Sequence, residues 1–128
     1  MTIRLNTAMR NAIADSITSL MGYTTLKIYT GTQPATGDTA ASGTLLVEIT
    51  LQGFNAAASG QATLYTGNPV QGTALASGTA GWARLTDGMK NFDGSVGTSG
   101  TDFIINTTAI TLGGTVTLTG CTINQPAS

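Results

Sequence analysis

Residues 87–94 bring together two carboxylates and an amide side chain, a combination that could bind calcium. In an EF-hand loop, Asp or Asn ligands alternate before a glycine at the sixth place, and a glutamate closes the loop at the twelfth. This segment does not follow that spacing. Because Asp-Gly is a common turn sequence, we favour two turns that bracket a short strand, and we predict no metal site.

Residues 94–100 are rich in glycine and hydroxyl side chains, which superficially suggests a phosphate-binding loop. The segment lacks the Lys-Ser/Thr ending of a P-loop and the Gly-x-Gly-x-x-Gly order of a dinucleotide fold. No helical pattern follows it. We therefore expect a flexible connection between strands, and we predict no bound cofactor.

General acid–base and nucleophilic catalysis also lack their usual residues. The absence of histidine removes Ser-His-Asp and Cys-His pairs, histidine zinc sites and an imidazole that titrates near neutral pH. Asp38, Asp87 and Asp93 lie at turn signals, and nothing pairs two carboxylates for glycoside hydrolysis. We predict that the protein is not an enzyme and has no small-molecule substrate.

Trp82 and Arg84 stand two positions apart in a strand-like segment, so their side chains share a face. They could form an exposed cation–π pair or a platform for carbohydrate. Aromatic residues make up only 5% of the chain, whereas sugar sites usually combine several aromatics with carboxylates. We favour a structural role, with Trp82 partly buried at a sheet edge or subunit contact and Arg84 at its rim.

Charge is scarce in this chain of 128 residues. Charged residues make up 9% of it, against about 25% in a typical soluble domain, and the net charge is −1. So few basic side chains cannot neutralise a run of phosphates, which argues against a nucleic-acid partner. No stretch approaches the length of about 20 apolar residues that crosses a bilayer. Residues 1–6 also lack the basic-then-apolar order of a secretion signal.

One amphipathic helix is predicted over residues 7–20. Asn6 or Thr7 can cap its start, and Gly22 offers a stop. Apolar residues recur at the three-and-four spacing of one helical face, and we expect the methionine among them to fill the core. They are Met9, Ala12, Ile13, Ile17 and Leu20.

From residue 23 onward the pattern changes to short strands. Residues 25–29 alternate between apolar and polar side chains, and residues 45–51 are apolar at every odd position. Small and turn-forming residues fill 31–44, which we predict to be a long surface loop. Further strands are expected at 61–65, 79–85, 102–106, 109–112 and 115–123.

These elements predict a mainly β fold, an antiparallel β-sandwich or barrel, preceded by one N-terminal α-helix. Residues 1–128 form a single domain, with an arm and helix over 1–22, the β-sandwich over 23–123 and a tail over 124–128. The single cysteine, Cys121, cannot form an intrachain disulfide. We expect it to be a small buried side chain.

Threonine, glycine and alanine replace the missing charges. The chain contains 25 threonines, 17 glycines and 16 alanines. Threonine packs well in strands, and its hydroxyl keeps an exposed face hydrated without charge. Burying a hydroxyl in a protein contact costs far less than burying an ion. Such a surface is suited to permanent contact with other protein subunits.

Four segments carry a family resemblance: LKIYTGTQP (26–34), GTLLVEITL (43–51), GWARLTDG (81–88) and DGSVG (93–97). With their order, which spans about residues 3–123, they resemble small virion structural proteins of tailed bacteriophages. The resemblance lies in strand and loop sequences and contains no catalytic signature. It implies a jelly-roll-like sandwich, because some phage cement proteins of this size have that fold.

The resemblance implies a head decoration, or cement, protein that binds the outer capsid surface as a homo-oligomer and stabilises the shell. Its partners would be the major capsid protein and copies of itself, and it would be made in the host cytoplasm. A tail or neck component is the alternative, and a carbohydrate-binding adhesin domain is a third. We expect the contacts at Thr2, Ile3, Arg4, Leu5, Pro34, Asp38, Trp82 and Arg84.

Overall fold

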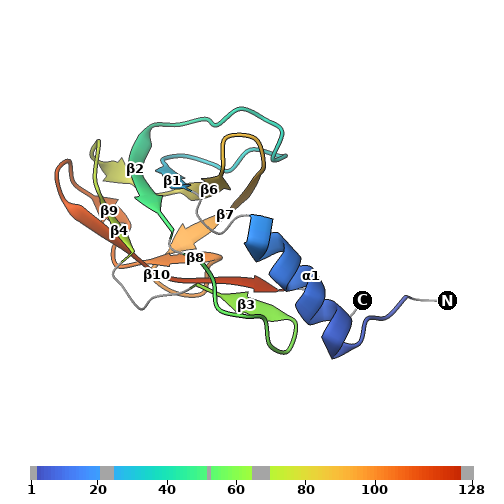
Figure 1. Ribbon diagram of the computed structural model, residues 1–128. Coiled ribbons are helices and arrows are strands. Elements are labelled where there is room, and N and C mark those ends of the chain that lie inside the picture. Colours follow the sequence, from blue (N-terminus) through green and yellow to red (C-terminus); the bar gives the residue numbers. More distant parts are fainter. Residues whose placement is uncertain (1–2, 21–24, 52, 65–69, 125–128) are drawn as a thin grey trace.

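The computed structural model describes residues 3–20, 25–51, 53–64 and 70–124 (Figure 1). Within these ranges a single helix, α1 (Thr7–Leu20), precedes a series of mostly short strands. The strands are β1 (Thr25–Tyr29), β2 (Leu45–Thr50), β3 (Gln61–Thr63), β4 (Gln71–Thr73), β5 (Gly78–Thr79), β6 (Trp82–Thr86), β7 (Asn91–Gly97), β8 (Phe103–Ile105), β9 (Ala109–Ile110) and β10 (Thr115–Asn124).

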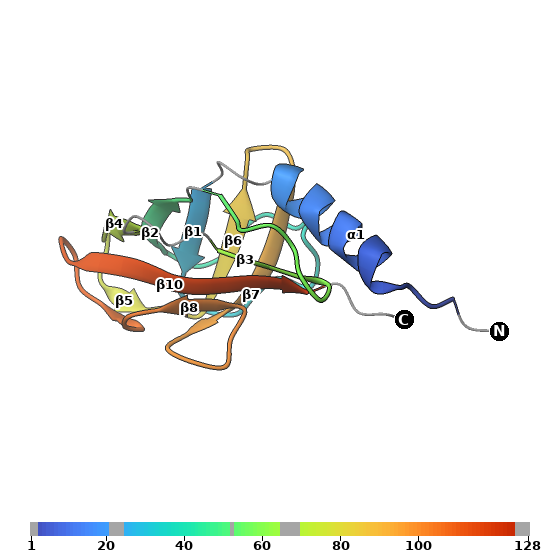
Figure 2. The ribbon, with the colours of Figure 1, turned by 60° about the horizontal axis from the view of Figure 1, so that its bottom comes forward.

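Most of the strands belong to one curled sheet. Its order is β2-β1-β6-β7-β8-β10-β3, and β4 also pairs with β10, while β5 and β9 form a separate pair. The curl brings β4 back toward β2, where the backbone N–H of Leu75 donates to the carbonyl oxygen of Leu46 at 2.7 Å (Figure 2). The predicted mainly β fold with one N-terminal helix is confirmed, and the curled sheet is compatible with a β-sandwich or half-barrel.

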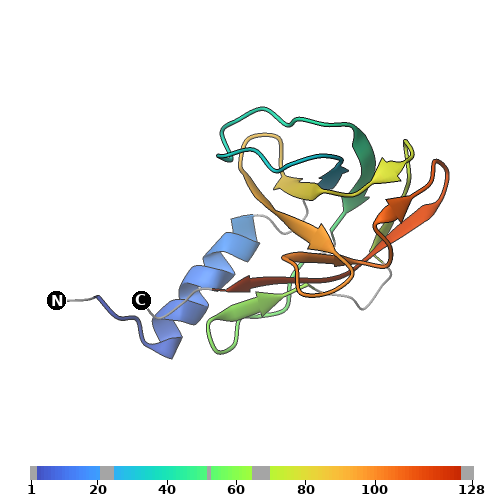
Figure 3. The same cartoon turned by 180° about the vertical axis from the view of Figure 1, so that it is seen from behind.

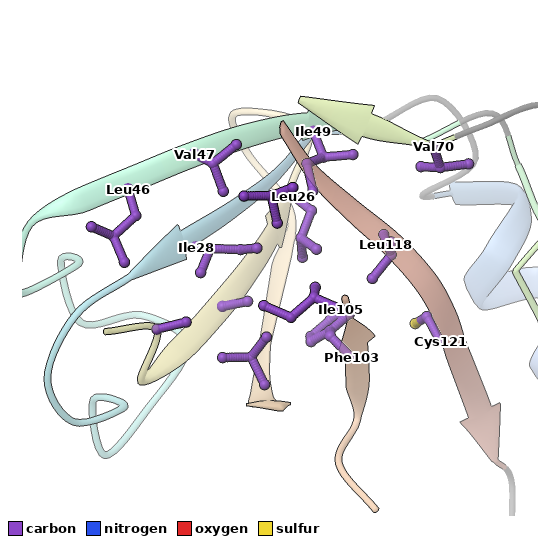
Figure 4. Packing of buried hydrophobic residues seen from close by; sticks show 14 of the residues in the cluster. Leu26, Ile28, Leu46, Val47, Ile49, Val70, Phe103, Ile105, Leu118 and Cys121 are labelled. Atoms are coloured by element: carbon purple, nitrogen blue, oxygen red, sulfur yellow. The ribbon is translucent and has the colours of Figure 1, made fainter. Parts of the chain in front are cut away.

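The hydrophobic core fills the inside of this curl (Figure 4). Leu26 of β1 faces Ile49 on one neighbouring strand and Leu85 on the other, and all three side chains are fully buried. The alternation in residues 25–29 is therefore the pattern of a strand with one face in the core. Phe103, Ile105, Val70, Leu118 and Cys121 close the core from the other side.

A β-bulge modifies the predicted pattern of β2. Ile28 pairs with Val47, but the next residue, Tyr29, pairs with Leu45, which leaves Leu46 as the extra residue. A bulge places two residues of one strand opposite one residue of its partner. Leu46 is fully buried as a result, although it stands at an even position that the alternation assigned to the outer face.

Two predictions for residues 93–100 are wrong in part: the Asp-Gly turn at Asp93 and Gly94, and the flexible connection over residues 94–100. Asp93 and Gly94 lie inside β7, and so do the residues up to Gly97. β7 pairs antiparallel with β6 and, over a short stretch, parallel with β8, where Val96 lies opposite Phe103. Pairing on both sides of β7 outweighs the local preference of Asp-Gly for a turn. Strand β4 was not predicted either, and the strand predicted over 79–85 is divided into β5 and β6.

Helix α1 has the predicted bounds, and its packed face matches the predicted one only in part: Ile13 and Ile17 are half-buried, but Ala12 is exposed. Asn6 caps its start, because the Oδ1 atom accepts the backbone N–H of Met9 at 2.9 Å. Ala14 is fully buried, whereas Met9 is 51% exposed, so the prediction that Met9 fills the core is wrong. The helix lies beside β3 and β10 and projects from the curled sheet (Figure 1).

Candidate interaction surface

The loop over residues 31–44 connects β1 to β2 and is closed tightly at its base. The backbone N–H of Thr30 donates to the carbonyl oxygen of Thr44 at 3.1 Å, and the N–H of Thr44 donates to Thr30 Oγ1 at 2.9 Å. Gly43 has a φ of +90°, and a Cβ there would overlap the carbonyl oxygen of Thr30. Only glycine fits this position without strain. The predicted surface loop is confirmed, and its two ends are fixed side by side (Figure 3).

Two side chains from neighbouring strands tie the middle of this loop to the outer face of the sheet. Arg84 of β6 donates from Nη2 to the carbonyl oxygen of Thr39 at 2.7 Å. Asn91 of β7 donates from Nδ2 to the carbonyl oxygen of Gly37 at 2.8 Å. Because both acceptors are backbone carbonyls, they constrain the path of the loop and leave its side chains free for other contacts.

Arg84 is itself fixed by a two-pronged ion pair with Asp93 on the adjacent strand. Its Nε lies 2.6 Å from Oδ1, and its Nη2 lies 3.0 Å from Oδ2. The side chains are only 12% and 4% exposed, respectively. The hydrogen bond to Asp93 raises the pKa of the Arg84 guanidinium above its ordinary value, although burial opposes this effect. A pair of this geometry is stronger and more directional than a solvated one.

Trp82 lies on the same outer face of the sheet as Arg84, and it is fully buried there. Its ring stacks on Tyr29, with centroids 4.8 Å apart and planes 15° apart, and the Arg84 guanidinium carbon lies 5.3 Å from the ring centroid. Its Nε1 has no hydrogen-bond partner among the described residues. Trp82 belongs to a strand inside the sheet order and is not partly exposed at an edge, which corrects our expectation. A buried ring cannot form an exposed carbohydrate platform.

The tip of the loop is exposed and has a single charge. The backbone N–H of Thr39 donates to the carbonyl oxygen of Thr36 at 3.2 Å, and their Oγ1 atoms lie 3.0 Å apart. This turn presents Asp38 to solvent, while Pro34 is half-buried. The neighbouring side chains at 35–42 are small or hydroxylic. The loop therefore offers a neutral, preorganised surface around one carboxylate.

The N-terminal arm contains the other predicted contact residues. Thr2 lies outside the described residues. Ile3 is 80% exposed, Arg4 is exposed and Leu5 is half-buried. The arm continues outward from the first residue of α1, Thr7, and away from the curled sheet (Figures 1 and 2). The structure thus does not bring the arm together with the loop within one chain.

Polar side chains attach α1 to the rest of the domain, and the sequence analysis did not identify them. Asp15 Oδ1 accepts the backbone N–H of Ala57 at 2.7 Å, and Asn11 Oδ1 accepts that of Gly60 at 2.7 Å. Arg10 donates from Nη2 to the carbonyl oxygen of Ser59 at 3.0 Å. The only available signal was that residues 11 and 15 are four apart, and so share a face of the helix.

The turn between β6 and β7 is also preorganised. Asp87 Oδ1 accepts the backbone N–H groups of Met89 and Lys90 at 2.9 and 2.6 Å, and Lys90 Nζ lies 2.6 Å from Oδ2. These contacts, chiefly the one from the Lys90 side chain, hold the pKa of Asp87 well below its usual range. The predicted Asp-Gly turn is confirmed here, and it presents Met89 with 90% of its surface exposed.

Other kinds of site find no support in the described parts of the chain. Among residues 3–20, 25–51, 53–64 and 70–124, no three His, Cys, Asp or Glu side chains gather where they could hold a metal ion. No helix in those ranges is long and apolar enough to span a membrane. Cys121 is 4% exposed, as expected, and burial raises the pKa of its thiol to about 12.

The fold and these surfaces define a small β-rich domain with a projecting N-terminal helix. We call the loop over residues 31–44 the latched loop, because Arg84 and Asn91 tie its backbone to the sheet. Comparison with known proteins adds no family to this description: no protein-family model, no curated protein and no solved structure matches the chain. The resemblance to phage virion proteins therefore remains a prediction from the sequence segments. The residues of the loop and the arm are the basis for a functional proposal.

Proposed function

We propose that this chain is a structural protein of a tailed-phage virion and decorates the outer surface of the head, where it binds the major capsid protein and stabilises the shell. The observation that carries the proposal is the loop over residues 31–44. Arg84 and Asn91 fix its backbone, while its exposed surface is nearly uncharged. A preorganised loop loses little conformational entropy on binding, and hydroxyl groups cost little to bury.

The mechanism requires no chemical step. A protein that binds the assembled shell, and not its dissociated subunits, shifts the equilibrium toward the shell by mass action. The stabilisation depends on the protein concentration and on the dissociation constant at each site. Because a shell repeats the same site over its lattice, a modest contact at each site can stabilise the whole particle.

A binding experiment with purified heads tests this proposal. Heads that lack the protein should bind it on mixing, co-sediment with it and withstand a higher temperature before they lose their DNA. Thr39→Pro should weaken this binding, because it removes the backbone N–H that closes the turn over residues 36–39 at the exposed tip. Lys90→Ala, at the separate turn between β6 and β7, is the control and should bind heads as the wild-type chain does. Heads that neither bind the protein nor gain heat stability would refute the proposal.

The alternatives make different predictions. A tail or neck component would bind at one vertex and leave the head lattice bare. An adhesin domain would bind glycans through Trp82, but the full burial of that ring in the outer layer argues against this function. Binding of a glycan that is lost in Trp82→Phe would favour the adhesin domain over decoration.

A further inference from the structure

Nearly all charged side chains of this protein have a partner within the chain. Lys27 lies 3.8 Å from Glu48, and the pairs Arg84–Asp93 and Lys90–Asp87 were described above. Asp102 accepts hydrogen bonds from the backbone and hydroxyl groups of Ser95, and both Arg10 and Asp15 on α1 hold the turn at 57–60. Nine of the 11 charged side chains therefore make a contact within the fold.

Arg4 and Asp38 are the exceptions. Neither side chain forms a hydrogen bond or an ion pair with any residue that the structure describes, and both are exposed. Their charges are opposite. Arg4 lies in the N-terminal arm, and Asp38 lies at the tip of the latched loop. They also lie in the two segments whose other side chains are largely neutral.

The two side chains are placed so that they cannot meet within one copy. The 14 residues of α1 correspond to a length of about 21 Å. In Figures 1 and 2 the helix runs outward from the curled sheet, with Thr7 at its outer end, and the arm with Arg4 continues beyond that end. Asp38, in contrast, belongs to a loop whose backbone is tied to β6 and β7. The arm and the loop therefore lie apart on the molecule (Figures 1 and 2).

We infer that the N-terminal arm of one copy binds the latched loop of a second copy of this chain, with Arg4 paired to Asp38. Ile3, which is 80% exposed in the single chain, would be buried against the loop surface around Pro34. The opposite charges set the register of the arm on the loop, since complementary charges at an interface favour one alignment over others.

Such a contact joins two different patches, so it is a head-to-tail contact. Each copy offers one arm and one loop, and the series ends only when a ring closes. This inference deepens the proposed function, because it assigns the arm and the part of the loop around Pro34 and Asp38 to contacts between copies, and leaves the exposed loop residues 39–42 for the capsid. It can be tested on the purified chain without any particle.

Charge reversal separates this contact from other modes of association. Sedimentation equilibrium of the full chain should show a concentration-dependent oligomer. Arg4→Asp and Asp38→Arg should each raise its dissociation constant about tenfold or more, because each places two like charges opposite each other in the contact. The double variant, with both changes, should return the dissociation constant to within about threefold of the wild-type value.

A matched control changes the net charge by the same amount elsewhere. Lys90→Asp alters an exposed lysine at the turn between β6 and β7, and it should leave the dissociation constant within about threefold of wild type. The variants at Arg4 and Asp38 should keep the wild-type thermal unfolding temperature at low protein concentration, since both side chains are exposed. A double variant that remains as weak as the single variants would overturn the inference.

Two further results distinguish this inference from the proposed function. The inference is wrong if the chain is monomeric at high concentration. It is also wrong if Arg4→Asp abolishes binding to heads but leaves self-association unchanged, because the arm would then face the capsid. If the charge reversals behave as expected but no variant binds heads, the arm contact stands and the decoration function fails.

Discussion

At the scale of the residue, the charge pair between Arg84 and Asp93 joins two neighbouring strands and the loop that lies over them. Its two side chains are nearly buried, and the guanidinium also holds the loop through Thr39. Removing one partner of such a pair leaves an unpaired charge in a place where water cannot solvate it well. The pair therefore links the stability of the sheet to the position of the loop.

The replacement Arg84→Met should lower the free energy of unfolding by about 3 kcal/mol. A second change, Asp93→Leu, should restore much of the loss, because it removes the uncompensated carboxylate. Lys27→Met is the control: its pair with Glu48 is long and half-exposed, and its loss should cost less than about 1 kcal/mol. Urea unfolding at one fixed protein concentration measures all of these. Equal losses in Arg84→Met and Lys27→Met would contradict this account.

Cys121 gives a prediction about pH. Burial raises the pKa of its thiol to about 12 in the folded chain, above an unfolded value of about 8.5. The stability that it contributes is therefore fully present below about pH 8.5 and decreases as the pH rises toward 12. The stability difference between wild type and Cys121→Ala should shrink over that range.

Thiol labelling gives an independent measurement of the same group. At pH 8 an aromatic disulfide reagent should modify Cys121 at a rate set by unfolding, and rapidly once denaturant is added. Rapid labelling of the folded chain would show that the thiol is accessible, and a stability difference that does not change between pH 8.5 and 12 would contradict its raised pKa.

At the scale of the element, the loop over residues 31–44 depends on two glycines with nearly the same backbone conformation. Gly31 has a φ of +86° and open space where a Cβ would stand, whereas Gly43 has a φ of +90° and the carbonyl oxygen of Thr30 at that place. The two positions therefore separate the conformational cost of a side chain from the cost of its overlap with the backbone.

Gly31→Ala should lower the free energy of unfolding by about 1 kcal/mol, which is the conformational cost alone. Gly43→Ala should lower it by about 3 kcal/mol, because the loop base must also open. Only Gly43→Ala should expose residues 31–44 to rapid proteolysis. Equal effects of the two changes on both measurements would show that the base of the loop is not closed as described.

Helix α1 is the second element whose attachment can be tested. Combining Asn11→Ala with Asp15→Ala removes the side-chain acceptors for the backbone N–H groups of Gly60 and Ala57. Proteolysis after the helix should become at least about tenfold faster, while the curled sheet keeps its cooperative unfolding. Met9→Gln is the control and should leave the cleavage rate unchanged, since Met9 is half-exposed. Unchanged cleavage in the double variant would mean that apolar packing alone holds the helix.

At the scale of the whole molecule, the sequence predicted the elements that have a regular pattern. The bounds of α1 followed from Asn6 and the helical spacing, and β1 followed from the alternation of Leu26 and Ile28. The fold class followed from the number of short strands between turn signals. These features depend on neighbours in the chain, so local physical rules are sufficient for them.

Features that depend on distant residues were not predictable in this way. Asp93-Gly94 has the composition of a turn, but it lies in a strand because it pairs with Arg84 and Ala83 of β6 and because Asp93 forms an ion pair with Arg84. The latch at Thr39 uses a backbone carbonyl, and any residue supplies one. The full burial of Trp82 requires the layer outside the sheet, which no periodic pattern describes. Pro34, Asp38 and Arg84 were named from the sequence, but Asn91 and the arrangement of these residues were not.

Imaging of the parent virion by electron cryomicroscopy would decide whether the protein decorates the head of a phage particle. We expect density for the chain at many equivalent positions over the outer surface of the head lattice. Residues 39–42 of the latched loop should face the capsid in that density. A particle whose head lattice is bare, with density for this chain confined to the tail or to a single vertex, would contradict the claim.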